Sequence, residues 1–168
     1  MRPPLFKQAG TTAVEFALLA GVFFTFVFGT MEVARLLYVY NTLQEVTRRA
    51  AEAASTVYPT DTNRTAWVRR HAIFRDDSGE LAAAPPVTDH HIRLDYLRFD
   101  LAVIPEGAWP ADAAANRQIC MGNPRAANCI RFVQASVCNP AQTGECTAVT
   151  SQMLLPLVDL PVRLHRAI

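Results

Sequence analysis

Apolar residues follow a helical pattern over the first third of the chain. Residues 16–31 form an uninterrupted run without a charged side chain, and beyond it apolar residues recur at steps of three and four. No proline interrupts residues 11–58, and Pro59 follows. The pattern therefore predicts a single helix roughly 70 Å long. Its apolar positions after the run are Val33, Leu36, Leu37, Tyr40, Leu43, Val46, Ala50, Ala54 and Val57.

The first half of this helix has the length of a membrane span. Residues 11–31 would extend about 31 Å as a helix, and the core of a bilayer is roughly 30 Å thick. The second half, residues 32–58, is amphipathic. We expect its apolar stripe between residues 40 and 57 to pack on the protein's own C-terminal sheet. Helices of other subunits are the alternative partner, and both contacts can occur along different stretches.

The pattern changes after the proline. Residues 61–74 predict a short helix capped by Thr60 or Asp61, with Trp67 and Ile73 on its inner side. Beyond this helix, alternating apolar and polar residues predict short strands. The strand candidates are residues 91–104, 130–137 and, more weakly, 147–155, and the segment 105–128 is predicted to be a loop.

The expected fold class is α+β, in which a long N-terminal transmembrane and stalk helix packs on a small antiparallel sheet. Residues 59–168 would form the domain outside the membrane. Of the 168 residues, 51% are hydrophobic, and 16 Lys and Arg balance 15 Asp and Glu, which argues against a nucleic-acid partner and against disorder. Arg2 and Lys7 precede the span without an acidic residue, which favours a cytoplasmic N-terminus.

All four cysteines lie in the last third of the chain, at Cys120, Cys129, Cys138 and Cys146. None forms a C-x-x-C pair and no histidine follows at zinc-finger spacing, so we expect disulfides in an oxidising compartment and no metal site. Cys129 and Cys138 flank a strand candidate about 30 Å long, which keeps them apart. Sequential pairing, Cys120 with Cys129 and Cys138 with Cys146, is the first choice. Cys120 with Cys138 and Cys129 with Cys146 stays open.

A processing site fits the start of the apolar run better than a secretory cleavage site. Gly10 ends a short basic leader, Thr11 would begin the mature chain, and Glu15 would be its fifth residue. A carboxylate at the edge of a span is costly unless it is paired. The new ammonium of Thr11 would lie one helical turn away and could pair with Glu15 of the same or a neighbouring subunit. The alternative is an uncleaved signal anchor, in which Gly10 is an incidental loop glycine and Glu15 an interfacial charge.

The leader resembles the class III signal of type IV pilins and pseudopilins, which a prepilin peptidase cuts after glycine on the cytoplasmic side. Residues 9–55 resemble the N-terminal signature of the TadE-like family. The resemblance rests on Ala13-Val14-Glu15-Phe16-Ala17-Leu18, the apolar run, Glu32 and Arg35, and an Ala-rich helix with Arg48-Arg49. The segment from Cys129 through Cys138 to Cys146 is also similar to a pattern of some TadE-like proteins.

The resemblance implies a minor pseudopilin of the tight-adherence (Tad, or Flp) pilus, a type IV pilus system. Residues 1–10 would be a leader that is removed, and the Glu15 carboxylate would act in subunit docking. The protein would cross the bacterial inner membrane once, with its C-terminal domain outside the cytoplasm, and would have no catalytic activity and no cofactor. The implied partners are a prepilin peptidase, other minor pseudopilins, the inner-membrane platform proteins, the major Flp pilin and membrane lipid.

The chain carries no P-loop, G-x-S-x-G or H-E-x-x-H motif, which argues against an assembly ATPase and against common hydrolase signatures. His90 and His91, with Asp89 and Asp95, form the cluster that most suggests catalysis or a metal. Adjacent strand residues point to opposite faces, however, and make a poor chelate. Two rival hypotheses stay open. One is a signal-anchored exported enzyme with a site near His90 and Asp95, and the other is an uncleaved structural membrane protein without a pilus role.

Overall fold

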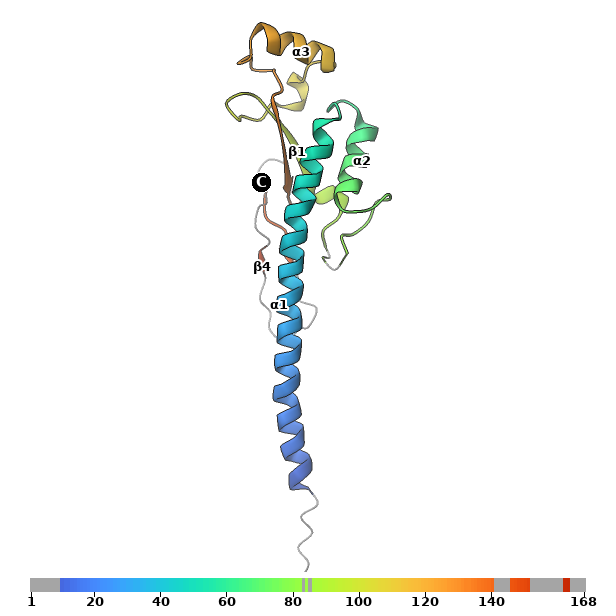
Figure 1. Ribbon diagram of the computed structural model, residues 1–168, viewed down its shortest axis with the longest axis vertical. Helices are drawn as coiled ribbons and strands as arrows, with labels where there is room; N and C mark the ends of the chain where they lie inside the picture. Colours follow the sequence, from blue (N-terminus) through green and yellow to red (C-terminus); the bar gives the residue numbers. More distant parts are fainter. Residues whose placement is uncertain (1–9, 83, 85, 141–145, 152–161, 164–168) are drawn as a thin grey trace, which may run out of the picture.

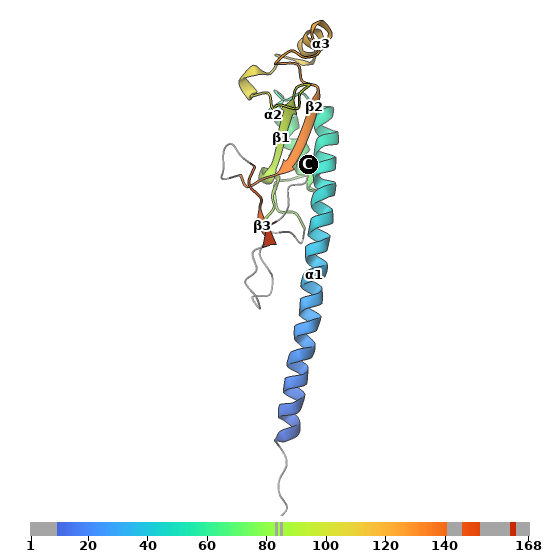
Figure 2. The same ribbon diagram turned by 90° about the vertical axis from the view of Figure 1, so that its left-hand side faces the viewer.

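The structure is a computed structural model that describes residues 10–82, 84, 86–140, 146–151 and 162–163. Helix α1 (Thr11–Ser55) forms the long axis, and its N-terminal part projects away from the other described elements (Figure 1). Three further elements lie beside its C-terminal part, and α3 lies at the far end (Figure 2). These elements are α2 (Thr62–Ala72), β1 (Ile92–Leu97), β2 (Phe132–Val137) and α3 (Ala113–Gly122). The α+β fold with a long N-terminal helix is confirmed.

Smaller elements complete the described chain. Two 3-10 helices, Asp89–His91 and Glu106–Ala108, lie before and after β1. Strand β3 (Thr150–Ser151) pairs antiparallel with β4 (Val162–Arg163). Of the weak strand candidate at 147–155, residues 150 and 151 are in β3, and residues 152–155 lie outside the described part of the chain.

Helix α1 ends three residues earlier than the pattern predicts. It stops at Ser55, and the N–H of Thr56 donates back into the last turn. A residue that precedes proline is driven out of the helical region, so Tyr58 before Pro59 cannot extend the helix. Tyr58 instead donates its hydroxyl to the carbonyl of Pro110 at 2.6 Å, which fixes the end of the helix to the region around α3.

One face of α1 packs on the sheet from Leu43 onward, as the apolar stripe between residues 40 and 57 predicts, but Tyr40 is exposed and Val39 is buried in its place, and the helix also packs on α2. The buried positions of the stripe share one core cluster with residues of β1 and β2. Towards the N-terminus the same stripe is uncovered, since Val33, Leu37 and Tyr40 are 58%, 60% and 46% exposed. The buried helix residues of this cluster are Val39, Leu43, Val46 and Ala50, and those of the strands are Ile92, Ala135 and Val137.

Strands β1 and β2 form an antiparallel pair, in register from Ile92 with Val137 to Leu97 with Phe132. Strand β1 is shorter than the predicted strand at 91–104, because the chain turns back after Leu97. In that turn Asp100 accepts a hydrogen bond from the N–H of Ala102, which lowers the pKa of the Asp100 carboxyl. Apolar residues after the turn continued the alternation and concealed the reversal.

Helix α2 begins where the sequence predicts. Asp61 caps it by accepting a hydrogen bond from the N–H of Arg64 at 3.0 Å. Ile73 is buried as expected, but the inward orientation predicted for Trp67 is wrong. Trp67 is 46% exposed and stacks on His71, with ring centroids 4.8 Å apart. The small side chains one turn apart that fill the inner face are Val68 and Ala72.

The segment 105–128 was predicted as a loop, and this prediction is wrong because it contains α3. Asp112 caps α3 by accepting from the N–H of Ala115 at 2.7 Å. The Asn116 amide then donates to the carbonyl of Ile130 and accepts from its N–H. No residue of α3 is fully buried, and its half-buried face, formed by Ala115, Asn116, Ile119 and Cys120, is short and mixes polar with apolar residues, so its pattern is weak.

Two disulfides are present, Cys120 with Cys129 and Cys138 with Cys146, which is the sequential pairing. We expect loss of the first to release α3 without unfolding the core, because α3 buries no residue and is tied to the strand region by Asn116 and this bond. Closing a loop of this length contributes about 2.5 kcal/mol. Replacing Cys120 and Cys129 by alanine should therefore speed hydrogen exchange of the α3 amides but leave the buried half of α1 protected.

The matched control replaces Cys138 and Cys146, which close a loop of similar length. That variant should speed exchange of the Asn139 amide, which donates to the carbonyl of Thr147, and leave α3 protected. Unchanged protection of α3 in the Cys120 and Cys129 variant would show that the disulfide does not hold this helix.

Candidate functional site

The start of α1 is an exposed helix end that requires no glycine. Gly10 is the N-cap, with φ −111° and ψ −27°, and its carbonyl accepts the N–H of Val14 at 3.3 Å. These angles do not lie in the left-handed region, and a Cβ built on Gly10 meets no atom within 4 Å. Neither packing within the described residues nor backbone geometry therefore explains a glycine at this position.

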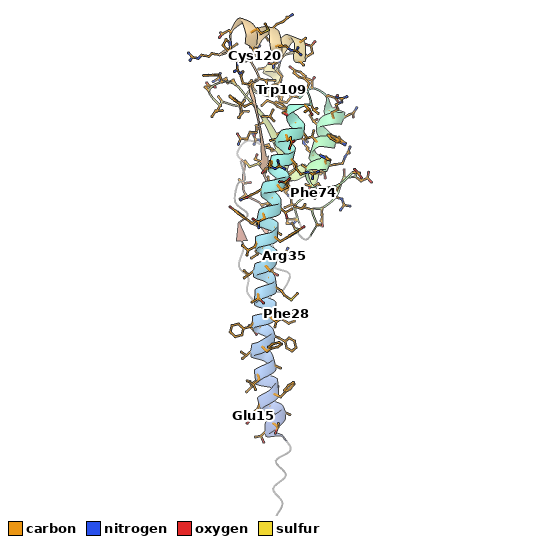
Figure 3. All side chains as sticks on the ribbon, viewed as in Figure 1. Glu15, Phe28, Arg35, Phe74, Trp109 and Cys120 are labelled. Atoms are coloured by element: carbon orange, nitrogen blue, oxygen red, sulfur yellow. A yellow bond between two sulfur atoms is a disulfide. The ribbon has the colours of Figure 1, made fainter. Side chains whose placement is uncertain are left out.

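Glu15 lies on the exposed first turns of the same helix, near the end of the molecule where α1 begins (Figure 3). Within the described part of the chain its carboxylate makes no hydrogen bond or ion pair. Its neighbours Val14 and Phe16 are 61% and 73% exposed. A carboxylate set in an apolar surface that enters a membrane is unfavourable unless another charged or polar group pairs with it. The structure therefore leaves Glu15 available to a partner outside the described fold.

The apolar surface extends from Glu15 along the first half of α1. Its most apolar stretch of 18 residues is entirely unburied. Among the described elements, α1 is the helix that is long and apolar enough to cross a membrane. Phe28 lies in this region, below Arg35 on the helix (Figure 3). Such a helix near the N-terminus fits a single-pass anchor.

A buried ion pair marks the end of the apolar run. Glu32 and Arg35 lie one turn apart, with 2.9 Å between carboxylate Oε1 and guanidinium Nη1. Their side chains are only 6% and 9% exposed, in contrast to the exposed residues before them. Because both charges are buried, loss of either one is costly.

A shallow apolar groove runs along α1 from the membrane half into the stalk half. Its volume is about 470 Å³, and it includes two of the uncovered positions of the stripe, Val33 and Leu37. Small residues on its floor would allow close approach of another helix. The groove is lined by Thr25, Phe26, Gly29, Thr30, Val33, Ala34 and Leu37.

The histidine cluster serves the local fold. His91 accepts a hydrogen bond at Nδ1 from the N–H of Thr88 at 3.0 Å, which closes the turn into β1. Asp95 pairs with Arg93 at 2.9 Å. No group of three or more metal-ligating side chains occurs within the described residues. The structure thus gives His91 and Asp95 roles in the turn and the strand.

His91 should make the stability of the domain dependent on pH. Burial, and secondarily His90, lowers its pKa below the usual 6.5, and a proton on Nδ1 would remove the acceptor used by Thr88. The folded protein then binds fewer protons than the unfolded chain as pH falls below about 6.5. The contribution of His91 to the free energy of unfolding is fully present above that pH and is lost as the pH falls below it.

Urea unfolding between pH 5 and pH 8 tests this expectation. The variant His91→Gln should show a smaller loss of stability at the acidic end than the unchanged protein. An identical pH profile in the two proteins would mean that other groups cause the dependence.

Comparison with known families assigns the N-terminal segment. Residues 10–52 match the family model of TadE-like proteins, which confirms the resemblance. The match starts at the N-cap of α1 and ends within its last turn, so it covers this helix and no part of the domain beyond it. No curated protein and no solved structure matches the chain. The TadE-like family is associated with Tad pili, and one N-terminal apolar helix fits single-pass anchoring in such a system.

Proposed function

We propose that this protein is a minor pseudopilin that helps to assemble a Tad (Flp) pilus and has no catalytic activity of its own. The observation that carries the proposal is a coincidence of boundaries. The TadE-like match begins at residue 10, helix α1 begins at Thr11, and Glu15 follows without a described partner. A glycine that the fold does not require is the residue expected at a site recognised by a prepilin peptidase.

Cleavage after Gly10 would compensate the charge of Glu15. It creates an ammonium group on Thr11, one helical turn from the Glu15 carboxylate. In the apolar surroundings of a membrane edge, opposite charges at this spacing attract strongly. The same ammonium could instead pair with Glu15 of a neighbouring subunit, which would align the two helices during assembly. Removal of residues 1–10 also takes away Arg2 and Lys7 and leaves 14 basic against 15 acidic residues.

The remaining parts of α1 fit an anchored assembly subunit. We infer that residues 11–31 cross the inner membrane and that the stalk half carries the domain of residues 59–168 on the outer side. The groove that contains Val33 and Leu37 offers an apolar helix face to another pseudopilin or to the major Flp pilin. The platform proteins of the inner membrane would contact the same helix before the subunit is taken into the assembly.

Intact mass of the protein extracted from membranes of a cell with a Tad prepilin peptidase tests the processing step. We expect a chain that starts at Thr11, and Gly10→Ala should retain the leader. Gly21→Ala is the matched control, because a Cβ at Gly21 also meets no atom within 4 Å, and it should be processed normally. A chain that starts at Met1, or an uncleaved Gly10→Ala variant with a normal number of pili, would contradict the proposal.

Glu15→Ala separates processing from assembly. This variant should be cleaved, because Gly10 is intact, and should give few or no pili by electron microscopy. Glu15→Gln keeps the size of the side chain and should fail in the same way if the charge is what matters. A normal number of pili in both variants would exclude a docking role for Glu15.

A further inference from the structure

A cavity of about 230 Å³ opens in the domain at the end farthest from Gly10. It lies between α2, β1 and the segment that contains Trp109, which Figure 3 shows close to the far end of α1. A second cavity of about 460 Å³ lies between the C-terminal end of α1, helix α3 and strand β2. Tyr96 lines both cavities. The first cavity combines apolar walls, formed by Leu94 and Trp109, with the polar side chains of Arg69, Tyr96 and Glu106.

Tyr96 is a buried polar group without a partner. Its side chain lies on β1 and is 3% exposed, yet its hydroxyl makes no hydrogen bond within the described residues. Trp109 packs edge-on against the ring at 5.4 Å, and its indole N–H is already donated to the carbonyl of Ile104 at 3.0 Å. Buried hydroxyls are normally paired, so one that lines a cavity indicates a missing acceptor.

Arg69 supplies a positive charge beside this hydroxyl. Both residues line the cavity, where burial raises the pKa of Tyr96. The Nε of Arg69 is buried and, among the described residues, has no hydrogen-bond partner. Two residues that each have an unpaired buried donor, one of them charged, therefore line the same small cavity.

We propose that this cavity binds a carboxylate carried by a peptide, with an apolar side chain next to it. The Tyr96 hydroxyl donates to one carboxylate oxygen and the Arg69 guanidinium to the other, an arrangement that favours an acceptor with two oxygens and one negative charge. Leu94 and Trp109 provide the apolar wall for the neighbouring side chain. Glu106 on the same rim disfavours more highly charged anions such as phosphate. The proposal is independent of the pseudopilin role, and its failure would leave that role intact.

Nuclear magnetic resonance of the full-length protein in detergent micelles provides a site-specific readout. The chain has two tryptophans, and Trp109 lines the cavity whereas Trp67 is exposed on α2 outside it. N-acetyl-leucine should shift the indole N–H signal of Trp109 in a saturable manner and leave that of Trp67 in place. N-acetyl-leucinamide, which lacks the carboxylate, should cause no shift, and acetate, which lacks the apolar group, should bind more weakly.

Three variants test the named residues. Tyr96→Phe should weaken binding of N-acetyl-leucine about tenfold or more, because hydrogen bonds to charged acceptors are strong. It should not lower the melting temperature, since the hydroxyl has no partner in the folded chain. Arg69→Gln should also weaken binding at least tenfold, and Glu106→Gln should strengthen it. Arg117→Gln, an exposed charge on α3, is the control and should change nothing.

The outcomes are decisive in both directions. Saturable binding of N-acetyl-leucine that Tyr96→Phe and Arg69→Gln weaken, at unchanged melting temperature, supports the proposal. No response of Trp109, an equal response to the amide, or unchanged binding in Tyr96→Phe would overturn it. Equal affinity for acetate would overturn the peptide part, because the site would then recognise a free anion alone.

Discussion

Replacing Leu43 by alanine is expected to lower the free energy of unfolding by about 2–5 kcal/mol, the usual cost of truncating a buried leucine. Leu43 is 3% exposed and belongs to the core cluster that joins α1 to Ile92 of β1 and Val137 of β2. Domains are stable by only about 5–15 kcal/mol, so a loss of this size should lower the melting temperature by many degrees. Circular dichroism of the full chain in detergent measures both changes. Urea unfolding gives the free energy, and thermal unfolding gives the melting temperature.

Leu37→Ala is the matched control, because it makes the same change on the same helix at a side chain that is 60% exposed. We expect its effect on unfolding to stay within about 0.5 kcal/mol. Equal losses in the two variants would contradict the assignment of the buried and uncovered parts of the stripe. A Leu37→Ala protein of normal stability that gives fewer pili would in turn support the groove as a contact between subunits.

The comparison of Leu43 with Leu37 also shows what the sequence could predict. The period of three and four predicts the helix and its apolar face, but it does not say where along the face the chain's own sheet ends. That boundary lies where the sheet ends at Ile92 and Val137, the paired strand residues that share the core cluster with Leu43. The cap of α2 is a local signal within one turn, and Asp61 is one of the two residues that the sequence predicts for it.

Helix α3 and the cavity lined by Tyr96 and Trp109 could not be predicted from the sequence, because both depend on contacts between separate segments. Helix α3 has no fully buried residue, and the contacts that hold it, a disulfide and the Asn116 amide, join it to residues outside the helix that its own pattern does not reveal. The cavity depends on Arg69, Tyr96 and Trp109, which come from three different segments and meet only in the folded domain. The processing site at Gly10 and the role of Glu15 stay predictions, and they rest on a short spacing at the start of one helix.

Glu32→Ala is expected to lower the free energy of unfolding by about 3–5 kcal/mol, because it removes the carboxylate from a buried ion pair. The two side chains are 6% and 9% exposed, so water cannot replace the lost partner easily. Urea unfolding of the full chain in detergent gives the value. A loss of less than about 1 kcal/mol would mean that the pair is solvated in the protein.

Glu45 and Arg48 provide a control with the same geometry. They also lie three residues apart on α1 at 2.9 Å, but their side chains are 41% and 67% exposed. Glu45→Ala should therefore leave the unfolding free energy almost unchanged. The double variant Glu32→Leu with Arg35→Leu should recover much of the stability that Glu32→Ala loses, since apolar side chains of suitable size often replace a buried ion pair without loss. Burial, and not the presence of an ion pair, then accounts for the difference in unfolding free energy lost at Glu32 and at Glu45.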